Sequence, residues 1–254
     1  GIAQGGLVDA PDGRWFAYLF QDSGAVGRIP YILPVEWIDG WPVVKPSSLN
    51  ASTTKPEIVA SDDFSASKMG LAWQWNHNPD PSGWSLKERK GYLRLKSARI
   101  DNEAVQARNT LTQRTFGPAC SGSICLETQN LKDGDCAGLM ALMGKYALVG
   151  VRKNGKSQEL AMVSAESGKP VDGECVPLNV QRVYLKLVCD FRDRADTAAF
   201  FYSLDGKIWK PIGKPAHLRY ELSHFMGCRF GLYMYSTKET GGFADFDWFK
   251  TGVL

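Results

Sequence analysis

The sequence predicts an all-β protein whose larger part is an antiparallel β-sandwich. Short runs that alternate apolar and polar residues follow one another at roughly regular spacing, as expected for strands with one buried face. Tight-turn signals with glycine, Asn154-Gly155 and Asp205-Gly206, separate some of these runs and are typical of β-hairpins. No segment keeps a sustained helical period of apolar residues, so helices are not expected in the core.

The opening segment, residues 4–43, is predicted to form three strands. Its apolar runs, of which the longer two cover 15–20 and 29–37, are separated by turn-forming residues at 11–13 and 23–27. An isolated antiparallel piece of this size is only marginally stable in water. The segment is therefore expected to be part of a larger β-structure.

The next segment, residues 46–56, is rich in Ser, Thr and Pro and has no apolar periodicity, which is typical of a linker. Beyond it, the predicted strands of the sandwich are residues 92–95, 123–127, 137–143, 146–151, 183–189, 199–203 and 229–235. We therefore expect a leading β-segment over 1–45, a linker over 46–56 and a sandwich over 57–254.

Charge and hydropathy argue against nucleic acid and membrane partners. The net charge is +3 and no long basic run exists; the cluster Lys87-Glu88-Arg89-Lys90 contains an acid and is expected to be a solvated surface, so nucleic acid is not an expected partner. No apolar run is long enough for a transmembrane helix, and the first residues lack the pattern of a signal peptide. The location is left open, with a secreted or periplasmic one favoured.

Two sets of residues resemble a known family. The opening segment contains, in order, QGGLVD, DGRWFAYLFQD, GAVGRIPY and DGWPV, and is similar to the last propeller blade of glycoside hydrolase family 43, the β-xylosidases and α-L-arabinofuranosidases. The second set, WQWNHNPDPSGWSLKERKGYLRL, ARNTLTQRT and GGFADFDWF, resembles the β-sandwich that follows the propeller in many members. The resemblance implies a fragment of a five-bladed β-propeller over 1–45, followed by a concanavalin-like antiparallel β-sandwich.

The resemblance implies the C-terminal portion of an inverting glycosidase, a β-xylosidase and/or α-L-arabinofuranosidase, acting on substrates derived from xylan and arabinoxylan. Such an enzyme needs two carboxylic groups across the scissile bond. In the family these lie on earlier blades, so we assign no catalytic residue here, and Asp12 and Asp22 are interpreted as turn and loop residues. The expected partners are an N-terminal propeller portion that carries the acids and a xylo- or arabino-oligosaccharide. The alternative is a non-catalytic carbohydrate-binding or structural module.

Three residues are expected to face substrate because of the resemblance. Arg28 matches the last-blade arginine that contacts substrate hydroxyls, and a guanidinium offers several fixed donors for that purpose. The alternative is a structural arginine that pairs with a neighbouring blade or with the sandwich. Gln4 follows Ala3, where the family commonly carries a histidine near a central metal ion or water, so Gln4 is either a substitute hydrogen-bonding group or a plain strand residue. Phe225 lies near the position of an aromatic residue that walls the pocket.

The aromatic residues Trp73, Trp75 and Trp84 could stack on sugar rings, because aromatic faces suit the apolar faces of sugars. The competing interpretation, which we favour, is that they are core residues beside a polar turn.

A structural calcium site is a candidate if the two ends of the sandwich are adjacent strands. Asp62 and Asp63 would then join Asp245 and Asp247, which strict alternation places on one face with Phe246 and Trp248 on the other. Exposed strand acids are the commoner outcome, so no metal ligand is assigned.

The six cysteines form no tight disulfide framework or metal pair, and buried thiols are the expected state. Cys120 with Cys125 is the best candidate for a bridge.

Overall fold

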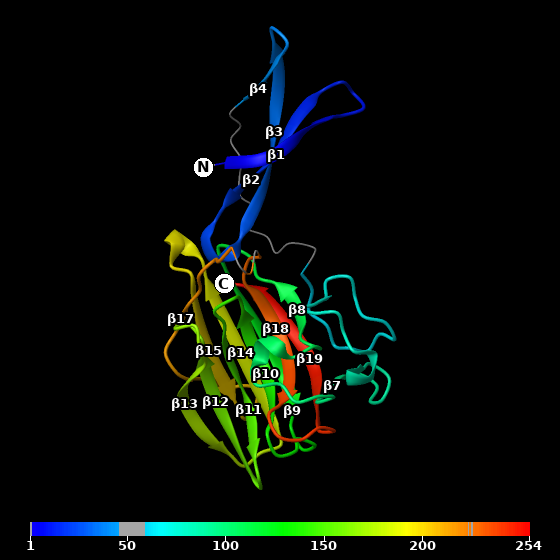
Figure 1. Ribbon diagram of the computed structural model, residues 1–254, viewed down its shortest axis with the longest axis vertical. Coiled ribbons are helices and arrows are strands. Elements are labelled where there is room, and N and C mark those ends of the chain that lie inside the picture. The colour runs from blue at the N-terminus through cyan, green and yellow to red at the C-terminus, as the bar shows by residue number, and fades with distance from the viewer. Residues whose placement is uncertain (1, 46–58, 223, 225) are drawn as a thin grey trace.

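The computed structural model describes residues 2–45, 59–222, 224 and 226–254, so Phe225 lies outside the described residues. The described chain contains β-strands and four short 3-10 helices, and no α-helix among these residues. The strands pair antiparallel, which confirms the predicted all-β class. Figure 1 shows two parts: a narrow leading sheet at the top and a broad sandwich below it.

The leading sheet has four strands in the order β1-β2-β3-β4, one more than predicted. They are β1 (Ile2–Asp9), β2 (Trp15–Asp22), β3 (Arg28–Ile38) and β4 (Trp41–Val44). After the last predicted run the chain turns at Asp39-Gly40, where both residues have positive φ, 51° and 79°, and continues into β4. This is the turn chemistry that a two-residue hairpin requires, so the Asp-Gly signal at this point was the clue to the fourth strand.

The leading sheet buries very little of itself. Its core consists of Ala17, Leu33 and Val35, and every residue of β1 is exposed. Trp41 is 75% exposed, and β1 and β4 each pair with a single neighbour among the described residues, which leaves an open edge on either side of this four-stranded sheet. A sheet of this kind gains too little apolar burial to be stable by itself, as its sequence suggested.

The sandwich consists of a seven-stranded and an eight-stranded sheet. The first has the order β13-β12-β11-β10-β18-β8-β5, with β13 (Val171–Leu178), β12 (Ser157–Ser164), β11 (Ala147–Asn154), β10 (Asp135–Leu142), β18 (Arg229–Ser236), β8 (Leu111–Arg114) and β5 (Gln74–Trp75). The second has the order β16-β15-β14-β9-β19-β7-β6, with β16 (Lys210–Pro211), β15 (Thr197–Ser203), β14 (Arg182–Asp190), β9 (Ala119–Glu127), β19 (Phe243–Val253), β7 (Leu93–Lys96) and β6 (Trp84–Ser85). The short β17 (Ala216–His217) pairs with β15. The 3-10 helices are η1 (Gly24–Val26), η2 (Pro81–Gly83), η3 (Ala104–Gln106) and η4 (Arg192–Arg194).

The core of the sandwich lies between these sheets. Alternate residues of the central strands, such as Leu139 of β10 and Ile124 of β9, point inward and are fully buried. Phe230 and Phe249 meet across the two sheets with ring centroids 5.8 Å apart. Burial of apolar surface between the sheets stabilises the fold by about 25 cal/mol per Å² and is the main force that holds the sandwich together.

A β-bulge in β19 overturns the predicted alternation around Asp245. Phe246 pairs with Leu126 and Trp248 pairs with Cys125, which leaves Asp247 as the extra residue. Phe246 therefore enters the core, while Trp248 lies on the outer face against Tyr184, with ring centroids 6.1 Å apart. The expectation that Phe246 and Trp248 share a face was wrong because strict alternation ignores the inserted residue.

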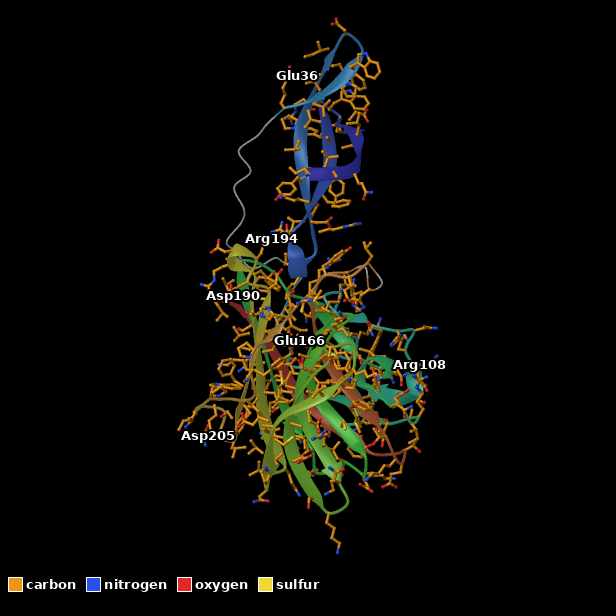
Figure 2. The ribbon with its side chains drawn as sticks, turned by 60° about the vertical axis from the view of Figure 1, so that its left-hand side comes forward. Glu36, Arg108, Glu166, Asp190, Arg194 and Asp205 are labelled. Atoms are coloured by element: carbon orange, nitrogen blue, oxygen red, sulfur yellow. The ribbon has the colours of Figure 1, made fainter. Side chains whose placement is uncertain are left out.

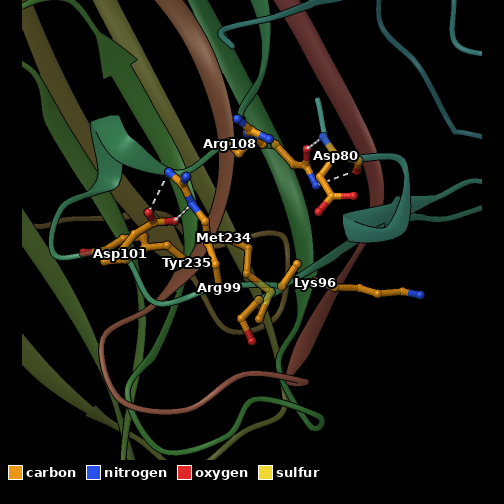
Figure 3. Close-up of a pocket in the computed structure, with 10 residues that line it drawn as sticks. Asp80, Lys96, Arg99, Asp101, Arg108, Met234 and Tyr235 are labelled. Atoms are coloured by element: carbon orange, nitrogen blue, oxygen red, sulfur yellow. Dashed lines mark hydrogen bonds and ion pairs between the residues drawn. The ribbon is translucent and has the colours of Figure 1, made fainter. Parts of the chain in front are cut away.

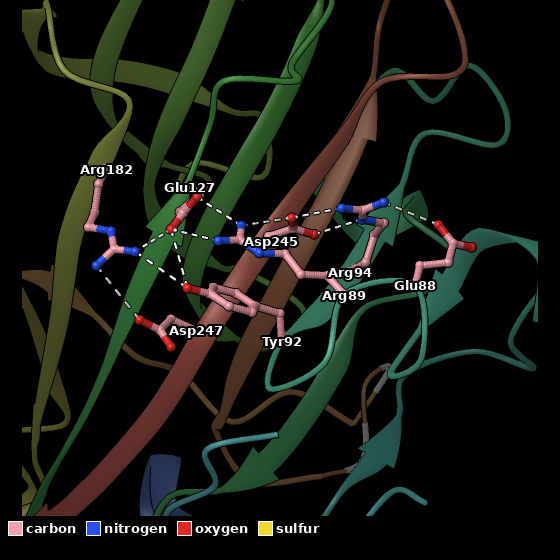
Figure 4. Close-up of polar contacts among 8 residues, drawn as sticks. All are labelled: Glu88, Arg89, Tyr92, Arg94, Glu127, Arg182, Asp245 and Asp247. Atoms are coloured by element: carbon pink, nitrogen blue, oxygen red, sulfur yellow. Dashed lines mark hydrogen bonds and ion pairs between the residues drawn. The ribbon is translucent and has the colours of Figure 1, made fainter. Parts of the chain in front are cut away.

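A network of ion pairs covers one region of the outer face of the eight-stranded sheet (Figure 4). Asp245, 2% exposed, accepts hydrogen bonds from Arg94 Nε over 2.8 Å and from Arg89 Nη1 over 3.1 Å. Arg89 also bonds Glu127 over 2.8 Å, and Glu127 pairs with Arg182 on β14. The charged cluster at 87–90 is thus only partly a solvated surface, because Arg89 ties its loop to two buried carboxylates.

The cysteines are free thiols, and five of the six are buried. Cys120 and Cys125 both lie on β9, five positions apart, so their side chains point to opposite faces of the sheet and cannot form a bridge. That candidate disulfide was wrong. Cys175 on β13 is exposed, unlike the buried state expected for the six thiols.

Replacement of Asp245 by alanine is expected to lower the free energy of unfolding by about 3–5 kcal/mol, because it leaves Arg89 and Arg94 as partly buried charges without that partner. Urea unfolding measures this effect. The matched control is Glu88→Ala, since Glu88 is more exposed and pairs with the same Arg94; its cost should stay below about 1 kcal/mol. Equal losses in the two variants would contradict the central place of Asp245.

The network should also appear in the pH dependence of stability. Burial acts to raise the pKa of Glu127, but hydrogen bonds from Arg89 and Arg182 outweigh it and hold that pKa below its ordinary value. A lowered pKa stabilises the fold above the unfolded pKa of about 4.5, and this contribution is lost as the pH falls through the folded pKa. Glu127→Gln should therefore be less stable than the parent at pH 7 by about 1–3 kcal/mol, with a gap that narrows below pH 4.5. A gap independent of pH would refute this account.

Candidate functional site

The two β-structures meet where the turn between β2 and β3 enters one end of the sandwich (Figure 1). Ala25, in η1, is completely buried there. Its N–H donates to Asp196 Oδ2 over 3.1 Å, and its carbonyl accepts a hydrogen bond from Cys228 N over 2.7 Å. Burial raises the pKa of Asp196, and the Ala25 N–H opposes that shift. The sandwich therefore forms hydrogen bonds with both the N–H and the carbonyl of Ala25 in this turn.

Two glycines allow this close approach. A Cβ atom on Gly227 would lie 2.1 Å from Val26 O, and one on Gly27 would lie 2.8 Å from Gly227 Cα. Gly27 also has a φ of 97°, which side chains rarely tolerate. Arg194 reaches the same turn and donates from Nη2 to Asp22 O over 3.3 Å; Figure 2 shows Arg194 at this end of the sandwich. The leading sheet is thus fixed by backbone contacts as well as by side chains.

A hollow of about 320 Å³ lies beside this junction. It is lined by residues from both structures, among them Arg28, Gln74, Arg114, Thr115, Tyr220 and Arg229. Two carboxylates are close in sequence to lining residues of the hollow, Asp22 to Arg28 and Glu221 to Tyr220, but neither is itself a lining residue. Asp22 pairs with Arg28, and Glu221 pairs with Lys145. The lining is therefore basic and polar.

Arg28, the arginine that the sequence singled out, is in this hollow. Its Nε donates to Asp22 Oδ1 over 3.0 Å, and its guanidinium lies over the Phe20 ring, 4.3 Å from the centroid. The side chain is 27% exposed. The partner Asp22 belongs to the same leading sheet, and contact of Arg28 with substrate stays a prediction.

Arg229 is the residue that the sequence reasoning missed. It opens the apolar strand β18 and is only 6% exposed, with Nε donating to Thr112 Oγ1 over 2.8 Å. Burial, together with the charge of Arg114, lowers the pKa of Arg229 to about 10. The clue was a charged residue at the start of an otherwise apolar run.

His224, in the same loop as Glu221, has a lowered pKa because of burial and the charge of Arg229. The lowered pKa favours the neutral imidazole, so His224, which is not among the lining residues of the hollow, adds no positive charge to it.

Gln4 is elsewhere on the leading sheet. It is exposed, has a φ of 48° and lies at the irregularity in β1 between Ala3 and Gly5. It is not a lining residue of the hollow, and a role in substrate contact stays a prediction.

The tryptophans divide into two cases. Trp73 is 7% exposed, packs against Phe249 with ring centroids 5.1 Å apart, and donates from Nε1 to Asp62 Oδ2 over 2.8 Å. It has no ring face open to a sugar, so its assignment as a stacking residue was wrong. Trp75 and Trp84 form a pair with centroids 5.0 Å apart and are half-buried against the core. Sugar stacking by these two stays a prediction.

The candidate calcium site does not form. Asp62 is opposite Phe249 of β19, so the two ends of the sandwich are adjacent, but its oxygens accept from Phe64 N and Trp73 Nε1. Asp245 is held by arginines instead. In the described part of the chain no group of three or more acidic, histidine or cysteine side chains could hold a metal ion. The proposed ligands fail because each already has other partners.

A second hollow lies near the loop that contains Asp80 (Figure 3). It holds about 20 Å³, which is room for about one water molecule. Arg99 at its rim is paired with Asp101 over 2.7 Å, and Lys96 points away from it in the close-up. This hollow is too small to be a ligand site.

Comparison with known proteins identifies the sandwich. Residues 61–251 match the family described as the β-xylosidase C-terminal concanavalin A-like domain. The chain belongs to this family. As a member of the family, it is similar over 97% of its length to a β-xylosidase of Formosa agariphila, at 29% identity. The chain covers 47% of that relative, so it spans about half the length of the curated relatives it matches.

Solved structures of glycoside hydrolase family 43 proteins have the same fold over nearly the whole chain. A bifunctional GH43-CE protein of Bacteroides eggerthii is 53% identical, with a TM-score of 0.94; the match covers all of this chain and 34% of that one. The GH43 protein BlXynB of Bacillus licheniformis is 27% identical, with a TM-score of 0.83; the match covers 98% of this chain and 53% of that one. The described residues of the present chain include no helix long and apolar enough to cross a membrane.

The backbone contact at the junction predicts a sensitive glycine. Gly227→Ala would force its new Cβ against Val26 O, and we expect a loss of about 1–3 kcal/mol of stability. The measurement is thermal unfolding together with the rate of proteolysis between the leading sheet and the sandwich. Gly6→Ala is the matched control, because a Cβ there meets nothing within 4 Å. Identical unfolding and proteolysis in both variants would show that the close approach does not matter.

Proposed function

We propose that this chain is the C-terminal portion of an inverting glycoside hydrolase of family 43. The enzyme would be a β-xylosidase and/or α-L-arabinofuranosidase that acts on oligosaccharides derived from xylan or arabinoxylan. Relatives named as a β-xylosidase, a putative β-xylosidase and a non-reducing-end α-L-arabinofuranosidase support this substrate class. The single observation that carries the proposal is the leading sheet with its small core and open edges, which presents Arg28 at the junction hollow.

The acid and base are proposed to come from an N-terminal propeller portion that joins the open edge of the leading sheet. Inversion needs one carboxylic acid to protonate the leaving oxygen and one carboxylate to activate water, on opposite faces of the sugar. Among the residues that the structure describes, no carboxylate lines the hollow. Glu36 lies high on the leading sheet, far from the junction in Figure 2, so it is not placed to serve there.

Arg28 is proposed to bind substrate hydroxyls beside those acids. Asp22 and Phe20 fix the guanidinium, so less side-chain entropy is lost when it donates to a sugar. Its positive charge would also favour the ionised form of a nearby catalytic carboxylate. The sandwich would close one side of the pocket through the segment around Tyr220 and Arg229.

A carbohydrate-binding module without chemistry is the second candidate. It is favoured by a hollow of about 190 Å³ on the outer face of the seven-stranded sheet, with Arg152 and Tyr235 among its lining residues. Affinity of the chain for xylan in the absence of any other portion would support this candidate over a role confined to the complete enzyme.

The test of the proposed function is reconstitution with an N-terminal propeller portion of a relative. The chain alone should not hydrolyse nitrophenyl β-xyloside or α-L-arabinofuranoside, and the combined protein should hydrolyse at least one. In the active combination, Arg28→Ala should lower kcat/KM about 10- to 100-fold, as expected when a charged hydrogen bond of about 1.5–3 kcal/mol is lost from the transition state.

Arg14→Ala is the matched control, because Arg14 lies in the same sheet, pairs with a neighbouring aspartate and is 71% exposed. It should leave kcat/KM unchanged. Hydrolysis by the chain alone would refute the need for an N-terminal portion, and an unchanged kcat/KM in Arg28→Ala would refute the role of Arg28.

A further inference from the structure

We propose that the junction hollow binds a carboxylate carried by the sugar substrate, through Arg229 and Arg114. The ligand class is an acidic sugar, such as a glucuronic acid unit attached to a xylose chain. This inference rests on the proposed function, because it names a class of substrate for the same junction.

The first step of the argument is the balance of charge. Three guanidinium groups line the hollow, those of Arg28, Arg114 and Arg229. Arg28 is paired with Asp22 over 3.0 Å. Neither Arg114 nor Arg229 forms an ion pair with any residue in the ranges that the structure describes. The hollow thus contains two positive charges that this part of the chain leaves uncompensated.

The second step is the burial of one of these charges. Arg229 is 6% exposed, and its Nη2 is buried without a hydrogen-bond partner among the described residues. Its Nε is fixed by Thr112 Oγ1, so the guanidinium cannot swing out to solvent without breaking that bond. A water molecule can satisfy an N–H donor but does not neutralise a buried charge. An anion in the hollow that Arg229 lines would neutralise that charge.

The third step concerns the shape of the ligand. A guanidinium matches a carboxylate with two parallel hydrogen bonds, which distinguishes a carboxylate from a simple point charge. The volume of about 320 Å³ exceeds the needs of a small inorganic anion and is at the lower end of the range for ligand pockets. Gln74 and Tyr220 add polar groups to the wall, suited to sugar hydroxyls. These features together favour a carboxylate on a sugar ring.

The experiment is calorimetric titration of the whole chain with two xylo-oligosaccharides that differ only in one glucuronic acid branch. The acidic oligosaccharide should bind at least 10-fold more tightly than the neutral one, and the difference should shrink as salt rises. Arg229→Gln and Arg114→Gln should each remove most of that difference. Arg108→Gln is the control, because Arg108 lies at the other hollow and should leave affinity unchanged.

Each result decides the inference. Equal affinity for both oligosaccharides, or an unaltered preference in both variants, would overturn it. Acetate that binds as tightly as the acidic oligosaccharide would also overturn it, since the sugar would then contribute nothing. If Arg229→Gln does not fold, Arg114→Gln decides, because Arg114 is exposed and its replacement leaves the core intact. The titration needs no N-terminal portion, so its failure is distinct from a failure of the reconstituted enzyme to hydrolyse neutral substrates.

Discussion

The backbone contact between Ala25 and the loop at Gly227-Cys228 is the interaction on which the arrangement of this molecule depends. The leading sheet has too small a core to hold its own position, and its edges are open. What fixes it is a buried turn with hydrogen bonds on both sides and two facing glycines. On the Gly227-Cys228 side backbone atoms meet directly, so that half of the contact does not depend on a side-chain rotamer, while Asp196 Oδ2 holds the other half.

Arginine side chains have different surroundings on the two outer faces of the sandwich. On the eight-stranded sheet, the partly buried Arg89 and Arg94 pair with the buried Asp245, so charge is balanced within the chain. On the seven-stranded sheet, Arg229 is buried without such a partner among the described residues. A buried pair is weak evidence of function because it is self-sufficient, whereas a buried unpaired charge needs something from outside. This contrast separates a structural network from a candidate site.

Much of the fold could be predicted from sequence because strands leave a period of two and hairpins leave Asn-Gly or Asp-Gly. The sequence also indicated that the leading segment is too small to be stable by itself, because its few apolar runs cannot form a core without a partner sheet. The bulge at Asp247 was not visible, because one inserted residue changes the face of Trp248 without altering composition. The burial of Trp73 and of Arg229 depends on contacts between residues far apart in the chain, which no local pattern records.

The candidate site illustrates why a resemblance finds one arginine and misses another. Arg28 could be predicted because a local motif surrounds it, and the hollow does contain it. Arg229 has no motif, and its importance arises only when β18, β8 and the β2–β3 turn come together. The hollow belongs to neither part alone, since the leading sheet supplies Arg28 and the sandwich supplies Arg114 and Arg229. In the enzyme that we propose, the sandwich would affect substrate choice by setting the position of these charged groups relative to the leading sheet.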